Sequence, residues 1–467
     1  MAGNAVARSA PAVLVALLAL AAAAACRPAE RVARPNVLLI SLDTTRADRL
    51  GIYGYGRPTS PALDQLARDG AWYEHAYTTA TWTLPAHASL FTGKFPKSHG
   101  ARYDANGPLV LGDQLHERAD WKRIRARGLG ADQHTLAEQL RDAGYRTGGV
   151  VGGPWLKAVF GLSRGFEQWD DRGITTVNGR PAASVTNAAL AWLDAPEAQG
   201  KPFLLFLNYF DPHTPFYPPG NFVDLVVPAA EQPKGEAKTD RDLSNLYDGE
   251  IRTMDFHIGR LLDALRAKGL YDSMLIVAVA DHGELLGEHG EFGHGASLYQ
   301  PELHIPLVVK PPRGEGPRGR RDELIQISDV FPMILQRVGV EVPADVQAAF
   351  PPPPDRMAFA EVNPLKGIGR RGDWRAVIDG DWKYLESAAG DRLLFDVARD
   401  PDEATDESAA EPVRAERMRA AVDHWIASLP EPAPAAPGTT EVDAQTKRAL
   451  ESLGYLQGEK PPAPSAP

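Results

Sequence analysis

The sequence predicts an α/β fold built around a largely parallel sheet. Short apolar runs, such as residues 36–43 and 273–281, alternate along the chain with amphipathic segments of helical period, such as residues 241–271. This alternation is typical of parallel strands joined by helices that cover the sheet. Several apolar runs end in acidic or imidazole side chains. Because ligands of such folds bind at the carboxyl ends of the strands, we expect the functional site at that edge.

The elements of this main domain follow one another in a regular order. Runs typical of buried strands occupy residues 36–43, 146–153, 201–213 and 273–284. Helical patterns occupy residues 60–70, 134–145, 183–194 and 241–271. The first helix has Ser60 as its candidate cap and Gly70 as its stop. We set the bounds of the domain at residues 35–342.

The C-terminal part is organised differently. Residues 343–356 break the alternation and are expected to be a linker, followed by a small α+β subdomain at residues 357–430. In this subdomain an Asp-Gly turn predicts a hairpin at residues 373–387, and a helix is expected near residues 411–428. Residues 431–467 form a tail rich in Pro and Ala, in which we expect one short helix.

Composition restricts the class of protein. The 467 residues are enough for a large core and more than one domain. Hydrophobic residues (43%) and charged residues (24%) have the proportions of an ordinary globular protein. A net charge of −11 argues against nucleic acid as a partner, because binding to phosphates needs a clustered basic surface.

The N-terminal residues have the features of a targeting segment. Arg8 precedes an apolar stretch at residues 11–25 that is long enough for a signal-peptide core and short for a membrane span. It ends at Cys26, the only cysteine, which therefore has no partner for an internal disulfide. We expect residues 1–26 to be a signal peptide, either of the lipoprotein type with a lipid on Cys26 or a plain one, and residues 27–34 to be a tether. Either form implies export, to the periplasm of a bacterium or to a membrane through the lipid anchor.

Three of the predicted strands end in groups that could carry chemistry. Asp43 ends the first, and Asp211 with His213 follows another. Asp281 and His282 end the last strand of this domain. An Asp oxygen with a His nitrogen suits Zn²⁺ or Mn²⁺ better than Ca²⁺, which prefers oxygen ligands. The residues that follow add more candidates, namely Glu284, Glu288, His289 and His294.

The segment TWTLPAHASLFTG at residues 81–93 admits two interpretations. Thr83 precedes Leu-Pro and would be a fair N-cap of a helix. Alternatively, its hydroxyl is a nucleophile, and the free amides of the helix start stabilise an oxygen of the ester that it attacks. The two interpretations can hold together.

Five segments resemble, in this order, the sulfatase family within the alkaline phosphatase superfamily. They are PNVLLISLDTTRADRLGIYGY, TWTLPAHASLFTG, YFDPHTPFYPP, YDGEIRTMDFHIGRLLDAL and ADHGELLGEHGEFGHG. The resemblance runs from about Arg34 to Gly339 and extends more loosely into the C-terminal subdomain. It implies an alkaline-phosphatase-like three-layer sandwich and makes residues 35–342 a sulfatase-like catalytic domain.

The resemblance implies a metal site. Asp43 matches the metal-binding Asp after the first strand, and Asp281 matches the one after the later strand. His282 stands where many sulfatases have Asn and where related phosphonate and phosphate ester hydrolases have His. Thr44 replaces a second Asp, so one carboxylate is missing. Together with Thr83, these residues would bind one divalent metal ion, and the sequence does not decide between Zn, Mn, Mg and Ca.

The resemblance also implies catalytic and substrate-binding residues. Thr83 takes the position of the nucleophilic Cys or Ser, and His87 takes that of the arginine in the same motif. His213 matches a histidine that faces the substrate and its leaving group. His294 aligns with a substrate-binding Lys of related hydrolases. Because imidazole titrates near neutral pH, His87 and His294 in place of fixed charges would make the activity sensitive to pH.

The threonine changes the chemistry that the family resemblance implies. Most sulfatases convert the Cys or Ser to formylglycine, which expels sulfate by collapse to an aldehyde. Thr83 should not undergo that conversion and would attack directly, forming an ester that must then be hydrolysed. We therefore expect an exported, metal-dependent hydrolase of sulfate or phosphate esters, with the chemistry favouring phosphorus. Its substrate would be a small molecule or a glycan.

Two alternatives remain open at this point. The DHGE run together with Thr83 also resembles phosphoethanolamine and lipoteichoic acid transferases, which carry several transmembrane helices. A sulfatase-like surface protein that binds a ligand without catalysis is the other. The retention of Asp43, Asp281, His282 and a hydroxyl at residue 83 disfavours a binding protein, which has no need of a metal and a nucleophile.

Overall fold

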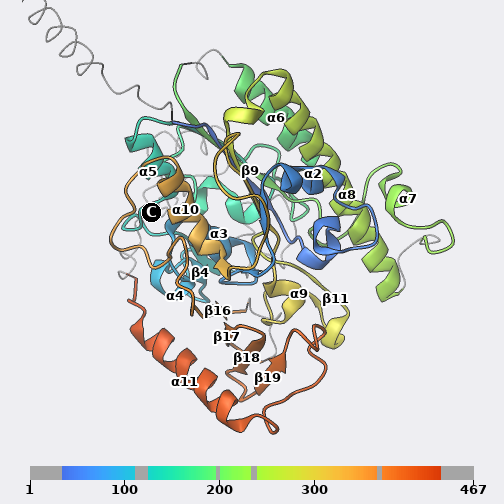
Figure 1. Ribbon diagram of the computed structural model, residues 1–467, viewed down its shortest axis with the longest axis vertical. Helices are drawn as coiled ribbons and strands as arrows, with labels where there is room; N and C mark the ends of the chain where they lie inside the picture. The colour runs from blue at the N-terminus through green and yellow to red at the C-terminus, as the bar shows by residue number, and fades with distance from the viewer. Residues whose placement is uncertain (1–33, 111–124, 196–199, 233–238, 365–370, 433–467) are drawn as a thin grey trace, which may run out of the picture. The chain divides into compact units, whose positions relative to one another are not determined.

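The computed structural model describes residues 34–110, 125–195, 200–232, 239–364 and 371–432, and one compact unit begins at Pro35. Its centre is an eight-stranded sheet of order β14-β2-β13-β10-β1-β9-β7-β8 (Figure 1). The strands are β1 (Val37–Leu42), β2 (Ala71–Tyr73), β7 (Arg146–Val150), β8 (Gln168–Asp170), β9 (Phe203–Tyr209), β10 (Leu275–Val279), β13 (Leu307–Lys310) and β14 (Gly319–Arg321).

Most of this sheet is parallel, as predicted. β1 lies at its centre and pairs in parallel with β9 on one side and with β10 on the other. All side chains of β1 are buried, which explains why every residue of the strand except Ser41 is apolar. Only β13 runs antiparallel to both of its neighbours, β10 and β2. The sequence patterns do not predict β2, β8, β13 or β14, because strands of three or four residues show no clear period.

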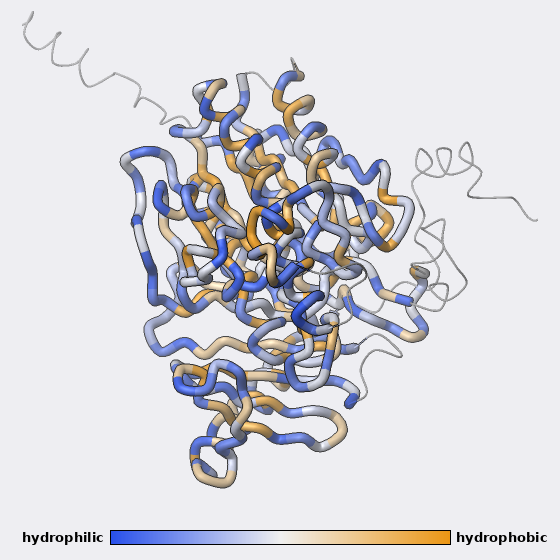
Figure 2. Tube along the Cα trace, turned by 90° about the vertical axis from the view of Figure 1, so that its right-hand side faces the viewer, coloured by the Kyte–Doolittle hydropathy of each residue, from blue (hydrophilic) through white to orange (hydrophobic). Residues whose placement is uncertain are grey.

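Helices cover both faces of the sheet, which confirms the predicted three-layer α/β architecture (Figure 1). One face carries α2 (Pro61–Asp69), α6 (Ala182–Asp194) and α8 (Asp240–Ala267), and the other carries α3 (Thr83–Thr92), α5 (Leu136–Asp142) and α10 (Val330–Arg337). Hydrophobic segments concentrate along the strands and the inner sides of these helices (Figure 2). Among the described residues, no helix is both long and apolar enough to cross a membrane.

The start of α2 is capped from a distant helix. Ser60 occupies the N-cap position, as predicted, but its hydroxyl accepts no hydrogen bond from the first turn. Asp255 of α8 does so instead, accepting from the main-chain amides of Ala62 at 3.0 Å and Leu63 at 2.9 Å. The orphan amides of this helix end are therefore satisfied by a tertiary contact.

A second, antiparallel sheet lies in the C-terminal part. It contains β16 (Ala358–Val362), β17 (Trp374–Asp379), β18 (Trp382–Ser387) and β19 (Arg392–Asp396), and α11 (Pro412–Ser428) packs on it. The predicted hairpin is formed by β17 and β18, whose ends Asp379 and Trp382 pair across the turn. The predicted C-terminal helix is α11. The small α+β region therefore contains the hairpin and the helix that the sequence predicts.

The segment expected to be a linker, residues 343–356, contains no helix or strand but is fastened to the end of α3. The main-chain amides of Gln347 and Ala348 both donate to the carbonyl of Gly93, at 3.0 and 2.9 Å. The signal peptide with Cys26, the tether up to residue 33, and the tail from residue 433 onward lie outside the described residues.

The remaining strands and α-helices of the described residues are short. They are β3 (Ala76–Tyr77), β4 (Arg102–Tyr103), β5 (Leu109–Val110), β6 (Arg125–Arg127), β11 (Leu285–Leu286), β12 (Phe292–Gly293), β15 (Ile325–Gln326), α4 (Pro96–His99), α7 (Phe222–Val226) and α9 (Gln300–Leu303).

Candidate active site

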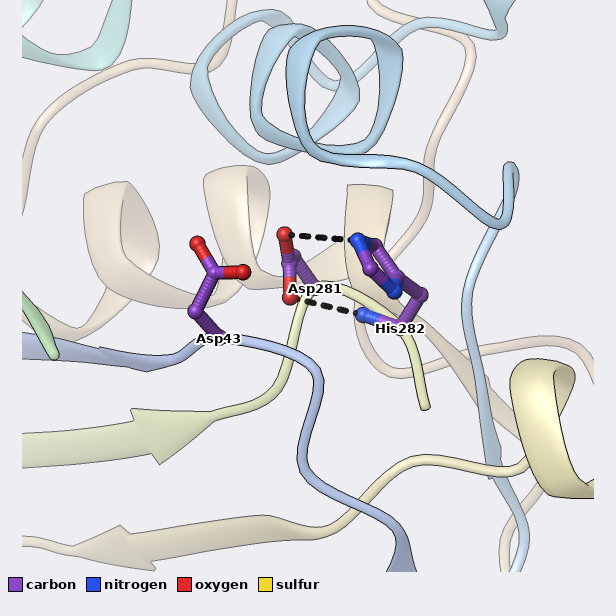
Figure 3. A group of neighbouring side chains, drawn as sticks. All are labelled: Asp43, Asp281 and His282. Atoms are coloured by element: carbon purple, nitrogen blue, oxygen red, sulfur yellow. Dashed lines mark hydrogen bonds and ion pairs between the residues drawn. The ribbon is translucent and has the colours of Figure 1, made fainter. Parts of the chain in front are cut away.

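The predicted metal ligands come together at the carboxyl ends of β1 and β10. Asp43 follows β1, and Asp281 and His282 follow β10, so the parallel pairing of these strands places the three side chains together (Figure 3). One ligand atom from each lies within 4.8 Å of the others. All three residues are fully buried. The sequence therefore predicted both the edge of the sheet and the residues of this cluster.

The two carboxylates each keep one oxygen free toward the cluster. The Oδ1 atom of Asp281 accepts hydrogen bonds from the main-chain amides of Thr44 (3.0 Å) and His282 (2.9 Å). The Oδ2 atom of Asp43 accepts from the side-chain amide of Asn208 at 2.9 Å. The other oxygens, Oδ2 of Asp281 and Oδ1 of Asp43, are buried and have no hydrogen-bond partner among the described residues. Orphaned carboxylate oxygens of this kind fit a cation.

The ring of His282 presents a lone pair to the same place. Its Nδ1 atom donates to the carbonyl of Gly283 at 2.9 Å, which leaves Nε2 without the proton in the neutral tautomer. Nε2 lies 3.3 Å from Oδ2 of Asp281 and 3.5 Å from the hydroxyl of Thr83. A lone pair facing a carboxylate is repulsive unless a cation or a proton lies between them. The donor set therefore fits a divalent metal ion.

Electrostatics support the same conclusion. Burial raises the pKa of Asp43 well above its ordinary value, and the nearby Asp281 raises it further. Burial also raises the pKa of Asp281 and lowers the pKa of His282. The two carboxylates are thus unfavourable as anions without a compensating positive charge, whereas the lowered pKa of His282 favours its neutral form, which has a free nitrogen lone pair. A divalent cation would supply the positive charge.

Thr83 lies at the start of α3, facing this cluster. Trp82, with an extended backbone, is the N-cap of α3, so Thr83 is the first helical residue rather than the cap. Every residue of α3 is buried, and Gly93 ends it in the left-handed conformation. The first-turn amides at Thr83 and Leu84 have no acceptor within the helix. The helix start and the hydroxyl therefore face the cluster together.

His87 lies one turn further along α3, where it is fully buried. Its Nδ1 atom is 2.8 Å from the carbonyl of Thr83 and 3.4 Å from Oδ2 of Asp281, and its Nε2 atom is 2.7 Å from the hydroxyl of Ser41. The side-chain amide of Asn208 donates to the same hydroxyl at 3.3 Å. Burial lowers the pKa of His87 to about 4. This geometry does not support the expectation that His87 titrates near neutral pH, because both of its nitrogens are engaged inside the protein.

His213 and His294 border the cluster on another side. The ring of His294 lies 4.5 Å from that of His282 and 4.8 Å from that of His213, between centroids. His294 pairs with Glu284 at 3.2 Å, and although burial opposes it, this carboxylate raises the pKa of His294. His213 stacks on Phe210 at 4.3 Å, and burial lowers its pKa to about 3. The structure thus brings both predicted substrate-binding histidines to the site.

Asp211 is the exception among the strand-end groups. Both of its oxygens accept from the main-chain amide of Ala182, at 2.9 and 3.1 Å, at the start of α6. Asp211 therefore lies after a strand, as expected, but is not part of the cluster of Asp43, Asp281 and His282. Asp211, which follows β9, instead accepts hydrogen bonds from the first residue of α6.

Two residues that the sequence interpretation missed support the loop after β1. Asn208 holds Asp43 and Ser41 and accepts from the amide of Gly153 at 2.8 Å. The hydroxyl of Tyr247 donates to the carbonyl of Thr44 at 2.7 Å. Asn208 could have been noticed as the polar residue in an otherwise apolar strand. Tyr247 has no such signal, because it lies on the regular apolar face of α8.

Comparison of the sequence with known proteins places the chain among ester hydrolases. The sequence model of the family described as Sulfatase matches residues 35–340. An arylsulfatase of Clostridium perfringens is 23% identical over 465 residues, covering 80% of this chain and 90% of that protein.

Solved structures agree at the level of the fold. The phosphonate monoester hydrolase from Silicibacter pomeroyi has a TM-score of 0.64 and 22% identity, with 84% of this chain and 94% of that chain covered. A protein solved in complex with its substrate D-glucosamine-2-N,6-O-disulfate has a TM-score of 0.66 and 19% identity, with 84% and 97% covered. The likeness extends over most of each chain.

Proposed function

Because the chain belongs to the sulfatase family and is a hydrolase of sulfuric or phosphoric esters, we propose that it depends on a metal ion, uses Thr83 as its nucleophile and acts on phosphorus esters. One observation carries the proposal. The hydroxyl of Thr83 lies 3.5 Å from Nε2 of His282, beside the unpartnered oxygens of Asp43 and Asp281.

The residues that would hold the ion are Asp43, Asp281, His282 and Thr83. Such an ion, when bound, lowers the pKa of a coordinated hydroxyl and neutralises charge on a non-bridging oxygen of the ester. The amides of Thr44, His282 and Asn208 occupy one oxygen of each carboxylate, which leaves the other oxygen available as a ligand.

The reaction proceeds in two displacements. The hydroxyl of Thr83 releases its proton to solvent as its oxygen forms a bond to phosphorus, and the leaving oxygen departs with its electron pair and takes a proton from His294. Water then attacks phosphorus and gives a proton back to His294, and the oxygen of Thr83 leaves with its electron pair and takes a proton from solvent. The first-turn amides of α3 stabilise negative charge on the ester in both steps.

The preference for phosphorus follows from the nucleophile. A threonine cannot become an aldehyde hydrate, so the covalent ester has no exit by collapse and must be hydrolysed at its central atom. The phosphonate monoester hydrolase from Silicibacter pomeroyi shares the fold over 84% of this chain. The arylsulfatase and the protein that binds a disulfated glucosamine point to aryl or sugar esters as the kind of molecule to test.

A paired assay tests the proposal. Aryl sulfate, phosphate monoester, phosphate diester and phosphonate monoester are compared with Mn²⁺ present, and T83A should lower kcat/KM for the best ester by about 10³-fold or more. T92A is the matched control, since Thr92 is a buried threonine of the same helix whose hydroxyl donates to the carbonyl of Ala88 at 2.7 Å. Fastest turnover of the sulfate, abolished in T83A, would contradict the preference for phosphorus.

The same assay separates the two alternatives. Transfer of the phosphoryl group to an added alcohol in preference to water would favour a transferase. Absence of bound divalent metal, together with no turnover of any ester, would favour a binding protein.

We further propose that the protein is exported and anchored by a lipid on Cys26. The support is the apolar stretch at residues 11–25, which ends in small residues before the only cysteine. Replacing Cys26 by Ala should move the protein from the membrane fraction to the aqueous fraction of a bacterial host. An unchanged distribution would contradict the lipid anchor.

A further inference from the structure

A buried carboxylate outside the cluster contacts two segments of the site. Glu302 lies in the single-turn helix α9 and is fully buried. Its Oε1 atom accepts from the main-chain amide of Gly295 at 2.8 Å, and its Oε2 atom accepts from the hydroxyl of Ser297. Gly295 directly follows His294. The side chain of Glu302 therefore holds the loop that carries His294.

The main chain of the same residue holds the turn of His282. The carbonyl of Glu302 accepts from the amide of Gly283 at 2.8 Å, and the carbonyl of Gly283 accepts from Nδ1 of His282 at 2.9 Å. The approach is close enough to require a glycine, since a Cβ atom on Gly283 would lie 1.9 Å from the carbonyl oxygen of Pro301. The orientation of the His282 ring is thus tied to α9.

The loop held by Glu302 also contacts the segment of the nucleophile. The hydroxyl of Thr81 donates to the carbonyl of Ser297 at 2.8 Å, two residues before Thr83. A Cβ atom on Gly295 would lie 3.2 Å from Cβ of Trp82, so this loop packs directly on the start of α3. The segment of the nucleophile is therefore joined, through Ser297, to the loop that Glu302 holds.

The far side of α9 is fixed by the C-terminal sheet. The amide of Gln300, at the start of α9, donates to Oε2 of Glu403 at 2.6 Å. Oε1 of Glu403 pairs with Nζ of Lys383 on β18 at 2.5 Å, and both side chains are fully buried. The position of Glu302 thus depends on the second sheet.

We propose that Glu302 is a positioning residue whose carboxylate keeps the ring of His294 directed at the substrate beside Thr83. The proposal rests on the proposed function in assigning His294 a role toward the substrate. Glu302 touches no reacting atom and acts through the hydrogen bonds to Gly295 and Ser297.

The test compares E302A, E302Q and H294A, and the double variant E302A/H294A, in the full-length protein. Two quantities are measured with Mn²⁺ present: kcat for the best ester and the affinity for inorganic phosphate. H294A should lower kcat about 10²-fold, the size expected for loss of a general acid. E302A should approach that loss, and the double variant should lie within about three-fold of H294A, because both changes remove the same contribution.

E302Q distinguishes a positioning role of Glu302 from a general effect of Glu302 on protein stability. E302Q keeps an acceptor for Gly295 and a polar group for Ser297, so its kcat and phosphate affinity should remain within about three-fold of the wild type. Affinity for Mn²⁺ should also change less than about three-fold in E302A, because the Glu302 side chain contacts none of the metal-binding side chains. If E302A does not fold, S297A removes the hydroxyl donor alone and should lower kcat about ten-fold.

Several results would overturn the proposal. One is a fall in kcat in the double variant that equals the product of the two single falls. Another is a kcat of E302Q as low as that of E302A. The third is a loss of Mn²⁺ affinity above about ten-fold in E302A. Glu361 is the matched control, a buried carboxylate that accepts from the main-chain amide of Lys97 at 2.6 Å, and E361A should leave phosphate affinity unchanged. A wild type that binds phosphate but hydrolyses no ester would contradict the proposed function, and the phosphate affinities would still decide the role of Glu302.

Discussion

The two oxygens of Asp281 have different roles. Oδ1 is held by two main-chain amides, whereas Oδ2 faces His282 and His87 without a hydrogen bond. One side chain therefore fixes the loops after β1 and β10 and also offers a free ligand atom. In the absence of metal, this arrangement places Asp281 next to the buried carboxyl of Asp43, which is unfavourable.

A substitution of Asp281 should separate these roles. We expect D281N to be at least as stable as the wild type in the presence of a chelator, because it removes one buried acid. Mn²⁺ at 100 times its dissociation constant should stabilise the wild type by about 2.7 kcal/mol and leave D281N unchanged. Thermal unfolding with and without Mn²⁺ measures this, and D211N serves as a control, because Asp211 is a strand-end carboxylate outside the cluster. Equal metal responses of the wild type and D281N would contradict the assigned ligand.

Glu250 provides a pH test away from the metal cluster. It lies on α8, accepts from the amide of Tyr217 at 2.6 Å, and has its pKa raised from 4.5 to about 9 by burial and by Asp211. The folded state therefore holds the proton more tightly than the unfolded state, and stability falls as pH rises from about 4.5 to about 9. We expect E250Q to match the wild type near pH 5 and to exceed its stability near pH 9 by more than about 1 kcal/mol. Unfolding in urea at both pH values decides this, with the exposed substitution E315Q as a control.

At the scale of elements, α3 is fixed at both of its ends. Its start meets the loop of Ser297 through Thr81, and its end meets residues 343–356 through the carbonyl of Gly93. Gly93 has a φ of +66°, and a Cβ atom there would lie 2.7 Å from Cγ1 of Val346. The end of the helix is therefore both conformationally restricted and crowded.

A pair of glycine substitutions should resolve these two effects. G54A changes a residue with a φ of +94° and no atom within 4 Å of the added Cβ, so it should cost about 1 kcal/mol for the backbone conformation alone. G93A should cost a further 1–3 kcal/mol or so, because the added carbon overpacks the contact with Val346. Free energies of unfolding in urea measure both. Equal costs would show that residues 343–356 adjust freely to the end of α3.

At the scale of the whole molecule, the second sheet supports the active site through a buried ion pair. Lys383 and Glu403 lie 2.5 Å apart, and Glu403 also holds the start of α9. The catalytic sheet and the antiparallel sheet therefore share contacts that reach His294 through Glu302. This arrangement predicts that loosening the second sheet changes the site.

Removing one member of this ion pair should destabilise the protein strongly, and removing both charges should destabilise it less. K383M should destabilise the protein by about 3–5 kcal/mol, because it leaves a buried carboxylate without its partner. The double variant K383M/E403Q should recover about 2 kcal/mol or more of this loss. K268M is the control, because Lys268 pairs with Asp194 in an exposed position, and it should cost less than about 1 kcal/mol. A double variant no more stable than K383M would contradict the role of an unpaired charge.

The order of strands and helices could be predicted from the sequence because each long element carries its own period. The all-buried β1 and the amphipathic α8 show this clearly. The cluster of Asp43, Asp281 and His282 could also be predicted, because parallel strands bring their carboxyl ends to one edge. The short strands β2, β8, β13 and β14 could not, since too few residues define a pattern.

Local patterns in the chain thus predicted the fold class, the edge of the sheet and the three side chains of the cluster. How those side chains are held follows from the packing of distant segments. Asp255 caps α2 through the amide of Ala62, 193 residues earlier in the chain, His87 directs both ring nitrogens inward, and Glu302 joins the loops of His282 and His294. Such contacts depend on which distant segments the sheet places side by side. A local pattern in the chain cannot predict them, because it does not contain the positions of those segments.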